Sequence, residues 1–298
     1  MRIPRRRFIG KSVTTTAGVL AGGSLAEGAP PSVEDDNPTA IVPLGRHLKV
    51  SRVGIGTGMR GWNRESNQTR MGAKAFDRLL NHCYDQGVRL FDAADLYGTH
   101  DDIARAMAGK PRESYSVVSK IWWRPRGLPE EERPDADVCV KRFLRELKTD
   151  YIDLVHLHCV TDPRWPQNLR RQMDILEELK QQGLIRAHGV SCHTLEALAA
   201  AADEPWVDAV NARVNPFGRK TDGPMEKVVP VLRKMHAAGK GVIGMKLCGE
   251  GTLDAEQRQE TLRYVMELGV VDAMIVGFET TEQVDAMLAG VRENLARA

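Results

Sequence analysis

The chain has 298 residues, of which 42% are hydrophobic and 28% are charged. Its 42 Lys and Arg side chains nearly balance 40 Asp and Glu side chains, so the formal net charge is +2. This balance excludes a strongly basic or strongly acidic protein, and it gives no argument for nucleic acid or a membrane surface as a partner. The length and the apolar fraction suffice for one large domain, such as an α/β barrel.

The first 26 residues have the layout of an export signal. Five basic side chains between Arg2 and Lys11 precede the uncharged stretch SVTTTAGVLAGGSLA. The run RRRFIGK resembles a twin-arginine signal, which implies the twin-arginine export machinery as a partner and a periplasmic or other extracytoplasmic location. The apolar part is too short for a stable membrane anchor.

Residues 27–46 are rich in Pro and polar side chains, which predicts a flexible linker. Removal of residues 1–26 takes away five basic residues and no acid, so 37 basic and 40 acidic side chains remain. This near-neutral body favours a small-molecule substrate. We expect the mature protein to be a monomer.

From residue 47 to residue 298, strand-like apolar runs alternate with stretches of helical period. The expected strands are residues 52–56, 89–93, 115–120, 152–158, 185–191, 209–214, 241–247 and 273–278. Eight such βα repeats predict an α/β fold, a single-domain (β/α)₈ TIM barrel. A doubly wound open sheet is the alternative.

Three neighbouring strands each end in a polar side chain that is expected to point into the barrel. Because side chains alternate along a strand, Asp92, Lys120 and His158 are the last inward residues of their strands. Tyr97 follows in the loop after Asp92. In such barrels the chemistry lies at the C-terminal ends of the strands, so these four residues are candidates for one site. His156 points inward one layer lower and is interpreted as a core histidine.

The phrases FDAADLYG, VVSK and YIDLVHLH together resemble the aldo-keto reductase superfamily, and HGVS and VDAVNARVNP continue the likeness. The chain is similar to a divergent, exported member. The resemblance implies an oxidoreductase that reduces an aldehyde or ketone, or runs the reverse reaction, with a nicotinamide cofactor. It also implies catalytic roles for Asp92, Tyr97, Lys120 and His158.

Carbonyl reduction needs a hydride on carbon and a proton on oxygen. A free tyrosine has a pKa of about 10, and a neighbouring ammonium lowers it, so Lys120 is expected to lower the pKa of Tyr97. Asp92 would supply the counter-charge for Lys120. His158 would donate a hydrogen bond to the carbonyl oxygen.

The resemblance places the cofactor along the ends of the later strands. Ser191 matches the family pattern, whereas Cys192 and Ala212 stand where an Asn and a Gln usually hold the nicotinamide. The implied cofactor contacts are Ser191, Met245, Lys246, Gly277, Thr280, Thr281 and Gln283.

The usual 2′-phosphate clamp is missing from the stretch GFETTEQV. Gly277 and Phe278 replace a Lys-Ser pair, Gln283 replaces an Arg, and Glu279 adds negative charge. A phosphate beside an unclamped carboxylate is disfavoured, so any preference for NADPH over NADH is expected to be small. Helix amides at Thr280 and Thr281 would still suit a pyrophosphate or ribose.

Trp62, Trp122 and Trp123 are expected to line the substrate mouth, which favours an apolar or ring-bearing carbonyl. The substrate pocket is not expected to contain a metal.

Three alternatives remain at this point. The motif GTGMRG (residues 56–61) matches a dinucleotide fingerprint, but WNRESNQT follows it instead of a helix, which favours a Gly-rich loop at the barrel mouth. The pair His156 and His158 would suit a metal-dependent barrel hydrolase, with His188, His193 and Asp272 as further ligands. A binding barrel that keeps the site without turnover is the third.

Overall fold

The computed structural model describes residues 36–297. The expected export signal, residues 1–26, and positions 27–35 of the expected linker lie outside the described residues. Within residues 36–297, no helix has both the length and the apolar character needed to cross a membrane.

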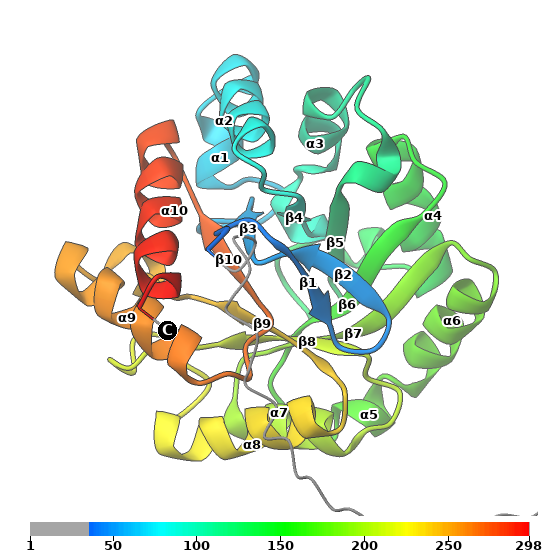
Figure 1. Cartoon of the computed structure of the whole chain (residues 1–298). Coiled ribbons are helices and arrows are strands. Elements are labelled where there is room, and N and C mark those ends of the chain that lie inside the picture. Colours follow the sequence, from blue (N-terminus) through cyan, green and yellow to red (C-terminus); the bar gives the residue numbers. More distant parts are fainter. Residues whose placement is uncertain (1–35, 298) are drawn as a thin grey trace, which may run out of the picture. The chain divides into compact units, whose positions relative to one another are not determined.

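Eight parallel strands close into a barrel in the order β10-β3-β4-β5-β6-β7-β8-β9 (Figure 1). They are β3 (Val53–Gly56), β4 (Leu90–Asp92), β5 (Ser116–Ile121), β6 (Ile152–Val160), β7 (Ile185–Cys192), β8 (Ala209–Arg213), β9 (Gly241–Met245) and β10 (Ala273–Gly277). All eight expected strands are confirmed. Closure of the sheet between β10 and β3 excludes the open doubly wound alternative.

Helices surround the barrel on its outer face (Figure 1). They are α1 (Asn67–Arg70), α2 (Ala73–Asp85), α3 (His100–Ala106), α4 (Ala136–Leu147), α5 (Trp165–Asn168), α6 (Arg170–Gln181), α7 (Leu195–Asp203), α8 (Met225–Ala237), α9 (Ala255–Glu267) and α10 (Thr281–Leu295). Short 3₁₀ turns add η1 (Asp95–Tyr97), η2 (Arg112–Ser114), η3 (Glu130–Glu132) and η4 (Gly249–Gly251).

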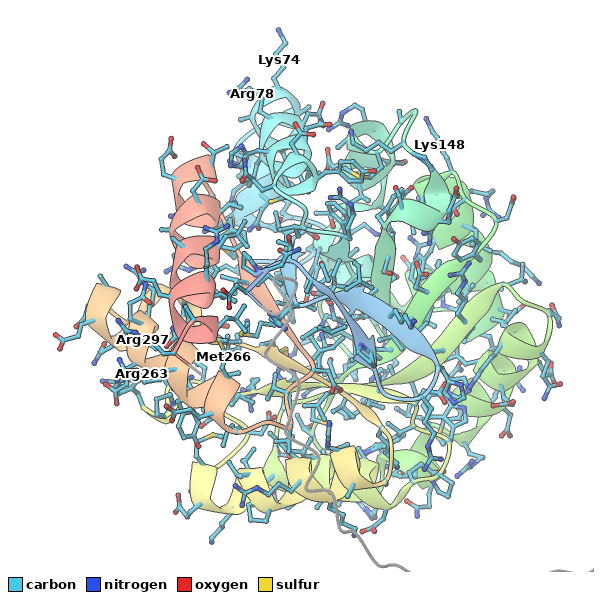
Figure 2. All side chains as sticks on the ribbon, in the orientation of Figure 1. Lys74, Arg78, Lys148, Arg263, Met266 and Arg297 are labelled. Atoms are coloured by element: carbon cyan, nitrogen blue, oxygen red, sulfur yellow. The ribbon has the colours of Figure 1, made fainter. Side chains whose placement is uncertain are left out.

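Helix α2 shows why these segments fold onto the barrel. Its apolar residues Phe76, Leu79, Leu80 and Cys83 recur at three- and four-residue spacing, so they share one buried face. Lys74 and Arg78 of the same helix are exposed and point away from the barrel, as Figure 2 shows.

The core has two main parts, one on each side of the sheet, and a small third cluster of Leu96, Trp122 and Leu128. The larger part fills the space between strands and helices, and it includes Phe76, Phe143 and Trp165. The smaller part fills the barrel itself. Its buried members are Leu44, Leu48, Val50, Leu90, Val118, Leu154, Ala187, Ala209, Ile243, Ala273 and Ile275. The alternation that predicted inward side chains on β4, β5 and β6 is therefore confirmed.

An antiparallel hairpin, β1 (Ile41–Leu44) and β2 (Leu48–Ser51), lies across one end of the barrel (Figure 1). Its apolar side chains belong to the core inside the barrel. Gly45 turns the chain at a φ of 57°, and a Cβ there would lie 2.5 Å from the backbone nitrogen of Gly241, at the start of β9. The hairpin therefore closes the N-terminal end. The structure differs here from the expected linker, because residues 41–46 of that range form a strand and a turn.

Candidate active site

Asp92, Lys120 and His158 lie at the C-terminal ends of three adjacent strands, and their side chains converge. The Nζ of Lys120 lies 2.6 Å from Oδ1 of Asp92 and donates a second hydrogen bond of 2.8 Å to the carbonyl oxygen of Ala93. The side chains of Lys120 and Asp92 are 1% and 7% exposed, and His158 is also buried. The expected counter-charge for Lys120 is therefore confirmed.

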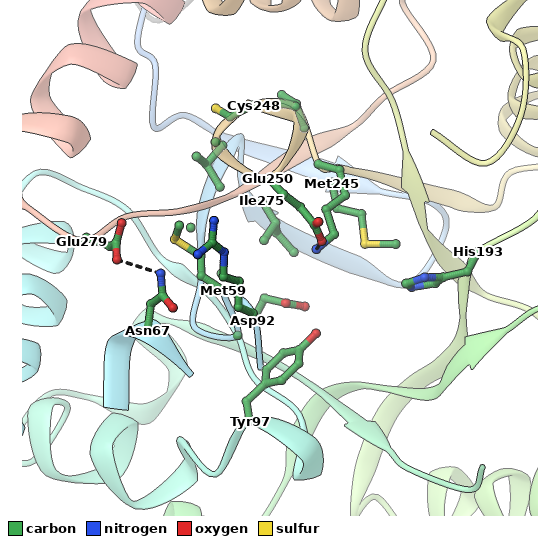
Figure 3. Close-up of a pocket in the computed structure, with 18 residues that line it drawn as sticks. Met59, Asn67, Asp92, Tyr97, His193, Met245, Cys248, Glu250, Ile275 and Glu279 are labelled. Atoms are coloured by element: carbon green, nitrogen blue, oxygen red, sulfur yellow. Dashed lines mark hydrogen bonds and ion pairs between the residues drawn. The ribbon is translucent and has the colours of Figure 1, made fainter. Parts of the chain in front are cut away.

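Tyr97 ends the 3₁₀ turn η1, which follows β4. Its hydroxyl lies 3.3 Å from Nε2 of His158, and the Nζ of Lys120 lies 4.9 Å from the centroid of its ring. The structure thus brings all four predicted residues into contact with one another, and two of them, Asp92 and Tyr97, line a cavity. Figure 3 shows Tyr97 pointing into this pocket beside Asp92, with Met245 and His193 on the other side.

The protonation of this group differs in one respect from the expectation. Burial raises the pKa of Tyr97 well above its ordinary value, and the Asp92 carboxylate raises it further. The expected lowering by Lys120 is therefore wrong. Lys120 is ion-paired with Asp92 and lies over the face of the ring, so its charge does not offset the cost of a buried phenolate. Tyr97 is a neutral phenol that keeps its proton.

His158 is also neutral. Burial lowers the pKa of its imidazole well below the ordinary value, and the positive charge of Lys120 lowers it further. Burial likewise lowers the pKa of Lys120, although Asp92 opposes the shift. A neutral His158 beside a neutral Tyr97 forms a pair that can donate hydrogen bonds to a carbonyl oxygen without carrying charge.

Asn211 completes the group and was missed by the sequence reasoning. It lies on β8, is fully buried, and donates a hydrogen bond of 3.2 Å from Nδ2 to Oδ1 of Asp92. Period-two alternation through Ala209, Asn211 and Arg213 is the signal that would have placed it inside the barrel.

A cavity of about 470 Å³ opens beside Tyr97 and Asp92. Three of the expected cofactor residues, Met245, Lys246 and Gly277, line it. The remaining lining residues are Gly56, Gly58, Met59, Arg60, Asn67, His193, Leu247, Cys248, Glu250, Gly251, Ile275, Val276 and Glu279. Arg60, Asn67, His193 and Glu250 had no expected place in a cofactor site, because they lie in loops or in the short elements α1 and η4, which the strand pattern does not place.

Four of the expected cofactor residues are not among the described residues that line this cavity: Ser191, Thr280, Thr281 and Gln283. Ser191 is buried, and its Oγ accepts a hydrogen bond of 2.8 Å from the backbone N–H of Cys159. It therefore fixes the end of β6.

Thr280 and Gln283 cap helix α10. The Oγ1 of Thr280 accepts from the N–H of Gln283 at 3.3 Å, and Oε1 of Gln283 accepts from the N–H of Glu279 at 2.8 Å. The amides at this helix start are therefore partly satisfied within the chain. Glu279 faces the cavity, and its Oε1 accepts a hydrogen bond of 2.9 Å from Asn67, drawn as a dashed line in Figure 3.

None of the three tryptophans expected to line the substrate mouth is among the described residues that line this cavity; Trp122 and Trp123 contact His158, and Trp62 contacts Trp122. The ring of Trp122 is edge-on to both His158, at 5.3 Å between centroids, and Trp62, at 5.7 Å. The indole N–H of Trp123 donates to the carbonyl oxygen of His158 at 2.8 Å. Trp62 remains 51% exposed.

The metal-hydrolase alternative is not supported by the placement of the histidines. His156 is fully buried in the barrel, whereas His188 stacks on Trp206 and hydrogen-bonds Glu177 of helix α6 at 2.9 Å, outside the barrel. Residues 36–297 contain no group of three or more His, Cys, Asp or Glu side chains arranged to hold a metal ion.

Comparison with curated proteins finds oxidoreductases. The chain is 26% identical over 231 residues to the uncharacterized oxidoreductase YqkF of Bacillus subtilis, an alignment that covers 72% of this chain and 68% of the relative. It is 30% identical over 122 residues to the methylglyoxal reductase DkgB of Salmonella typhimurium, covering 39% of this chain and 42% of that protein. The chain thus spans less than half of this second relative.

Comparison with solved structures supports the fold. A putative aldo-keto reductase from Pseudomonas aeruginosa superposes with a TM-score of 0.72 at 24% identity, over 88% of this chain and 99% of the other. An aldo/keto reductase from Klebsiella pneumoniae, solved with NADP and acetate, superposes with a TM-score of 0.61 at 21% identity, over 86% and 93%.

The model of the Aldo/keto reductase family matches residues 52–261, which is more than half of the chain and runs from β3 into α9. The match includes all four residues that meet beside the cavity. The chain therefore belongs to the aldo/keto reductase family and is an NAD(P)-dependent oxidoreductase.

Proposed function

We propose that this protein reduces an aldehyde or ketone, or oxidises the corresponding alcohol, with Tyr97 as the proton donor. The observation that carries the proposal is the approach of the Tyr97 hydroxyl to Nε2 of His158, 3.3 Å, beside an open cavity. Family membership supports a nicotinamide cofactor as the hydride source.

The residues that line the cavity fit such a cofactor chemically. Met245 and Ile275 offer apolar surface near Tyr97, while Arg60 and Lys246 offer positive charge for a pyrophosphate. Lys246 is partly neutralised, because its Nζ lies 2.7 Å from Oε1 of Glu250. These four residues are the ones we assign to the cofactor.

When bound, the nicotinamide supplies the hydride that adds to the carbonyl carbon. Tyr97 gives its phenolic proton to the carbonyl oxygen, and water then returns a proton to the phenolate. The Nε2–H tautomer of His158 donates a hydrogen bond to the same oxygen and orients it. Lys120 stays ion-paired with Asp92 close to the ring, where its charge reduces, without cancelling, the cost of the buried phenolate during the step.

The test is Tyr97→Phe in a reduction assay over a panel of aldehydes and ketones. Because a positioned acid contributes about 10²- to 10⁴-fold, we expect kcat to fall by at least about 100-fold. Cofactor affinity, measured by isothermal titration calorimetry, should stay within a factor of three of the parent, about 0.7 kcal/mol. The matched control is Tyr264→Phe on α9, which should leave kcat unchanged. Full turnover by Tyr97→Phe would refute the assigned acid, and cofactor binding without turnover by the parent chain would favour the non-catalytic barrel.

We also propose that NADPH is preferred over NADH only weakly. The support is the Glu279 carboxylate, which lines the cavity and is held there by Asn67. A 2′-phosphate near this charge is repelled. Glu279→Gln should therefore tighten NADPH binding several-fold and leave NADH binding unchanged. A preference of the parent chain for NADPH above about 100-fold, which is 2.7 kcal/mol, would contradict the proposal.

Export by the folded-protein route remains a proposal that rests on RRRFIGK alone. Folded export would allow a cofactor bound in the cytoplasm to travel with the protein. We expect the full chain to reach the periplasm of a bacterial host, and Arg6→Lys with Arg7→Lys to retain it in the cytoplasm. Cytoplasmic retention of the unaltered chain would rule the route out.

A further inference from the structure

Two glycines of the motif GTGMRG lie against the ring of Tyr97. A Cβ on Gly58 would lie 2.3–2.4 Å from three atoms of that ring, including Cζ, which carries the hydroxyl. A Cβ on Gly61 would lie 2.6 Å from Cδ1 of the same ring, on its other edge. Real Cβ atoms do not approach other atoms so closely, so a side chain at either position would force the ring to move.

Backbone conformation does not explain these glycines. Neither Gly58 nor Gly61 has a positive φ, whereas Gly98, one residue after Tyr97, has a φ of 67°. An alanine is therefore compatible with the local backbone at both positions, and space is what requires glycine there. The N–H of Gly61 donates to the carbonyl oxygen of Gly58 at 3.0 Å, which holds the two glycines in one tight turn.

The same loop also holds the turn that carries Tyr97. The N–H of Arg64 donates to the carbonyl oxygen of Leu96 at 2.9 Å, and the guanidinium of Arg64 contacts Oδ1 of Asp95 at 3.2 Å. A Cβ on Gly98 would lie 2.3 Å from the carbonyl oxygen of Arg64. Residues 58–64 thus pack closely against residues 95–98 and hydrogen-bond to them.

We propose that Gly58 and Gly61 are positioning residues that set the place of the Tyr97 hydroxyl by their lack of side chains. This inference rests on the proposed role of Tyr97 as the acid. The three nearest atoms to a Cβ on Gly58 all belong to the tyrosine ring, which is a side chain and can move; a Cβ on Gly61 would meet the ring most closely and also the backbone oxygen of Gly58, at 3.1 Å. The strain from a new methyl group therefore displaces the hydroxyl from His158. A displacement of about 1 Å in a catalytic group can cost about 100-fold in rate.

The kinetic test compares Gly58→Ala in two backgrounds. In the parent chain we expect kcat to fall by about 10- to 100-fold, with cofactor affinity within about threefold of the parent. In the Tyr97→Phe background the same change should lower the residual kcat by less than about twofold, since no hydroxyl remains to be displaced. Equal losses in both backgrounds would overturn the inference, because they would show that Gly58→Ala acts on the cavity or on folding.

Gly61→Ala serves as the second variant and is expected to behave in the same way. Gly223→Ala is the matched control, because Gly223 also lacks a positive φ and its Cβ would meet side chains far from Tyr97, Leu195 at 3.2 Å and Val228 at 3.8 Å. This control should leave kcat within twofold of the parent.

A second test does not depend on activity. Gly58→Ala should lower the urea midpoint of the parent chain, but it should leave unchanged or raise the midpoint of Tyr97→Ala, in which the ring is gone. A reversal of sign would establish the contact even if the parent chain shows no reductase activity. The same lowering in both backgrounds would refute it, and failure of the proposed function alone would leave this result intact.

Discussion

Asp92 is the residue on which the polar group of the site depends. Its Oδ1 accepts from both Lys120, at 2.6 Å, and Asn211, at 3.2 Å, and all three side chains are buried. Taking a carboxylate and an ammonium out of water is costly, so each ion is stable here only in the presence of the other. The pair is therefore a requirement for folding as well as for placing Lys120 beside Tyr97.

Asp92→Asn should destabilise the fold by about 3 kcal/mol, because it leaves the Lys120 ammonium buried without its counter-charge. The free energy of unfolding in urea at neutral pH measures the effect. Adding Lys120→Met to this variant should recover part of the loss. A double variant less stable than Asp92→Asn would contradict the explanation.

The protonation states of Tyr97 and His158 predict a flat pH profile. Burial lowers the pKa of His158 well below 6.5, so the imidazole is neutral from pH 6.5 upward; burial raises the pKa of Tyr97 well above 10, so the phenol keeps its proton at pH 8.5. We expect kcat for reduction to be constant over this range. His158→Gln should give a slower but equally flat profile. A decline in the parent with a midpoint between pH 6 and 7, absent from His158→Gln, would show that the imidazole titrates.

Among the elements, the turn η1 is small but firmly held. Asp95 within it is 1% exposed and forms ion pairs with Arg64, at 3.2 Å, and with Arg142 of α4, at 2.7 Å. These contacts tie the turn to the preceding loop and to a helix of the outer ring. A three-residue element thus has the rigidity that the placement of Tyr97 requires.

Asp95→Asn should lower the free energy of unfolding by about 2 kcal/mol, since it removes the buried carboxylate that two partly exposed arginines share. Thermal or urea denaturation measures the change. Lys141→Ala is the comparison, because it breaks an exposed pair with Asp137, 2.9 Å apart, on the same helix α4. That variant should cost less than about 1 kcal/mol. Equal losses in the two variants would argue against a special role for Asp95.

The sequence predicted the elements better than the contacts between them. Alternation placed Asp92, Lys120 and His158 correctly because it is a local property of each strand. The direction of the Tyr97 pKa was wrong because burial depends on how loops close over the ring. Residues 41–46 were assigned to a linker because the segment is Pro-rich at its start and its partner, Gly241, is distant in sequence. Asn67 begins the short helix α1 and His193 lies in the loop after β7, so residue spacing gives no direction for either side chain.

For the whole molecule, the two ends of the barrel differ in function: one is packed as core and the other carries the polar site. The hairpin β1–β2 fills the N-terminal end with Leu44, Leu48 and Val50, while the C-terminal end carries the four converging residues. This division follows from the parallel sheet, which presents all C-terminal strand ends on one side. Stability and chemistry can therefore be altered separately.

Leu44→Ala should destabilise the protein by about 2–4 kcal/mol, because it leaves a cavity in the barrel core. Its kcat at 25 °C should match that of the parent. Ile41→Ala is the control, since Ile41 is 56% exposed and its truncation should change stability by less than about 0.5 kcal/mol. A large loss of kcat in folded Leu44→Ala would show that the two ends are coupled.

Trp62 and Trp122 provide an intrinsic fluorescence signal for ligand binding. Trp62 and Trp122 lie edge to face, Trp122 also lies beside His158, and Trp62 is half open to solvent. A ring-bearing molecule that enters from this side changes the polarity around both, and their emission shifts with it. The affinities of ligands for the unlabelled chain can therefore be ranked by tryptophan fluorescence before any turnover is known.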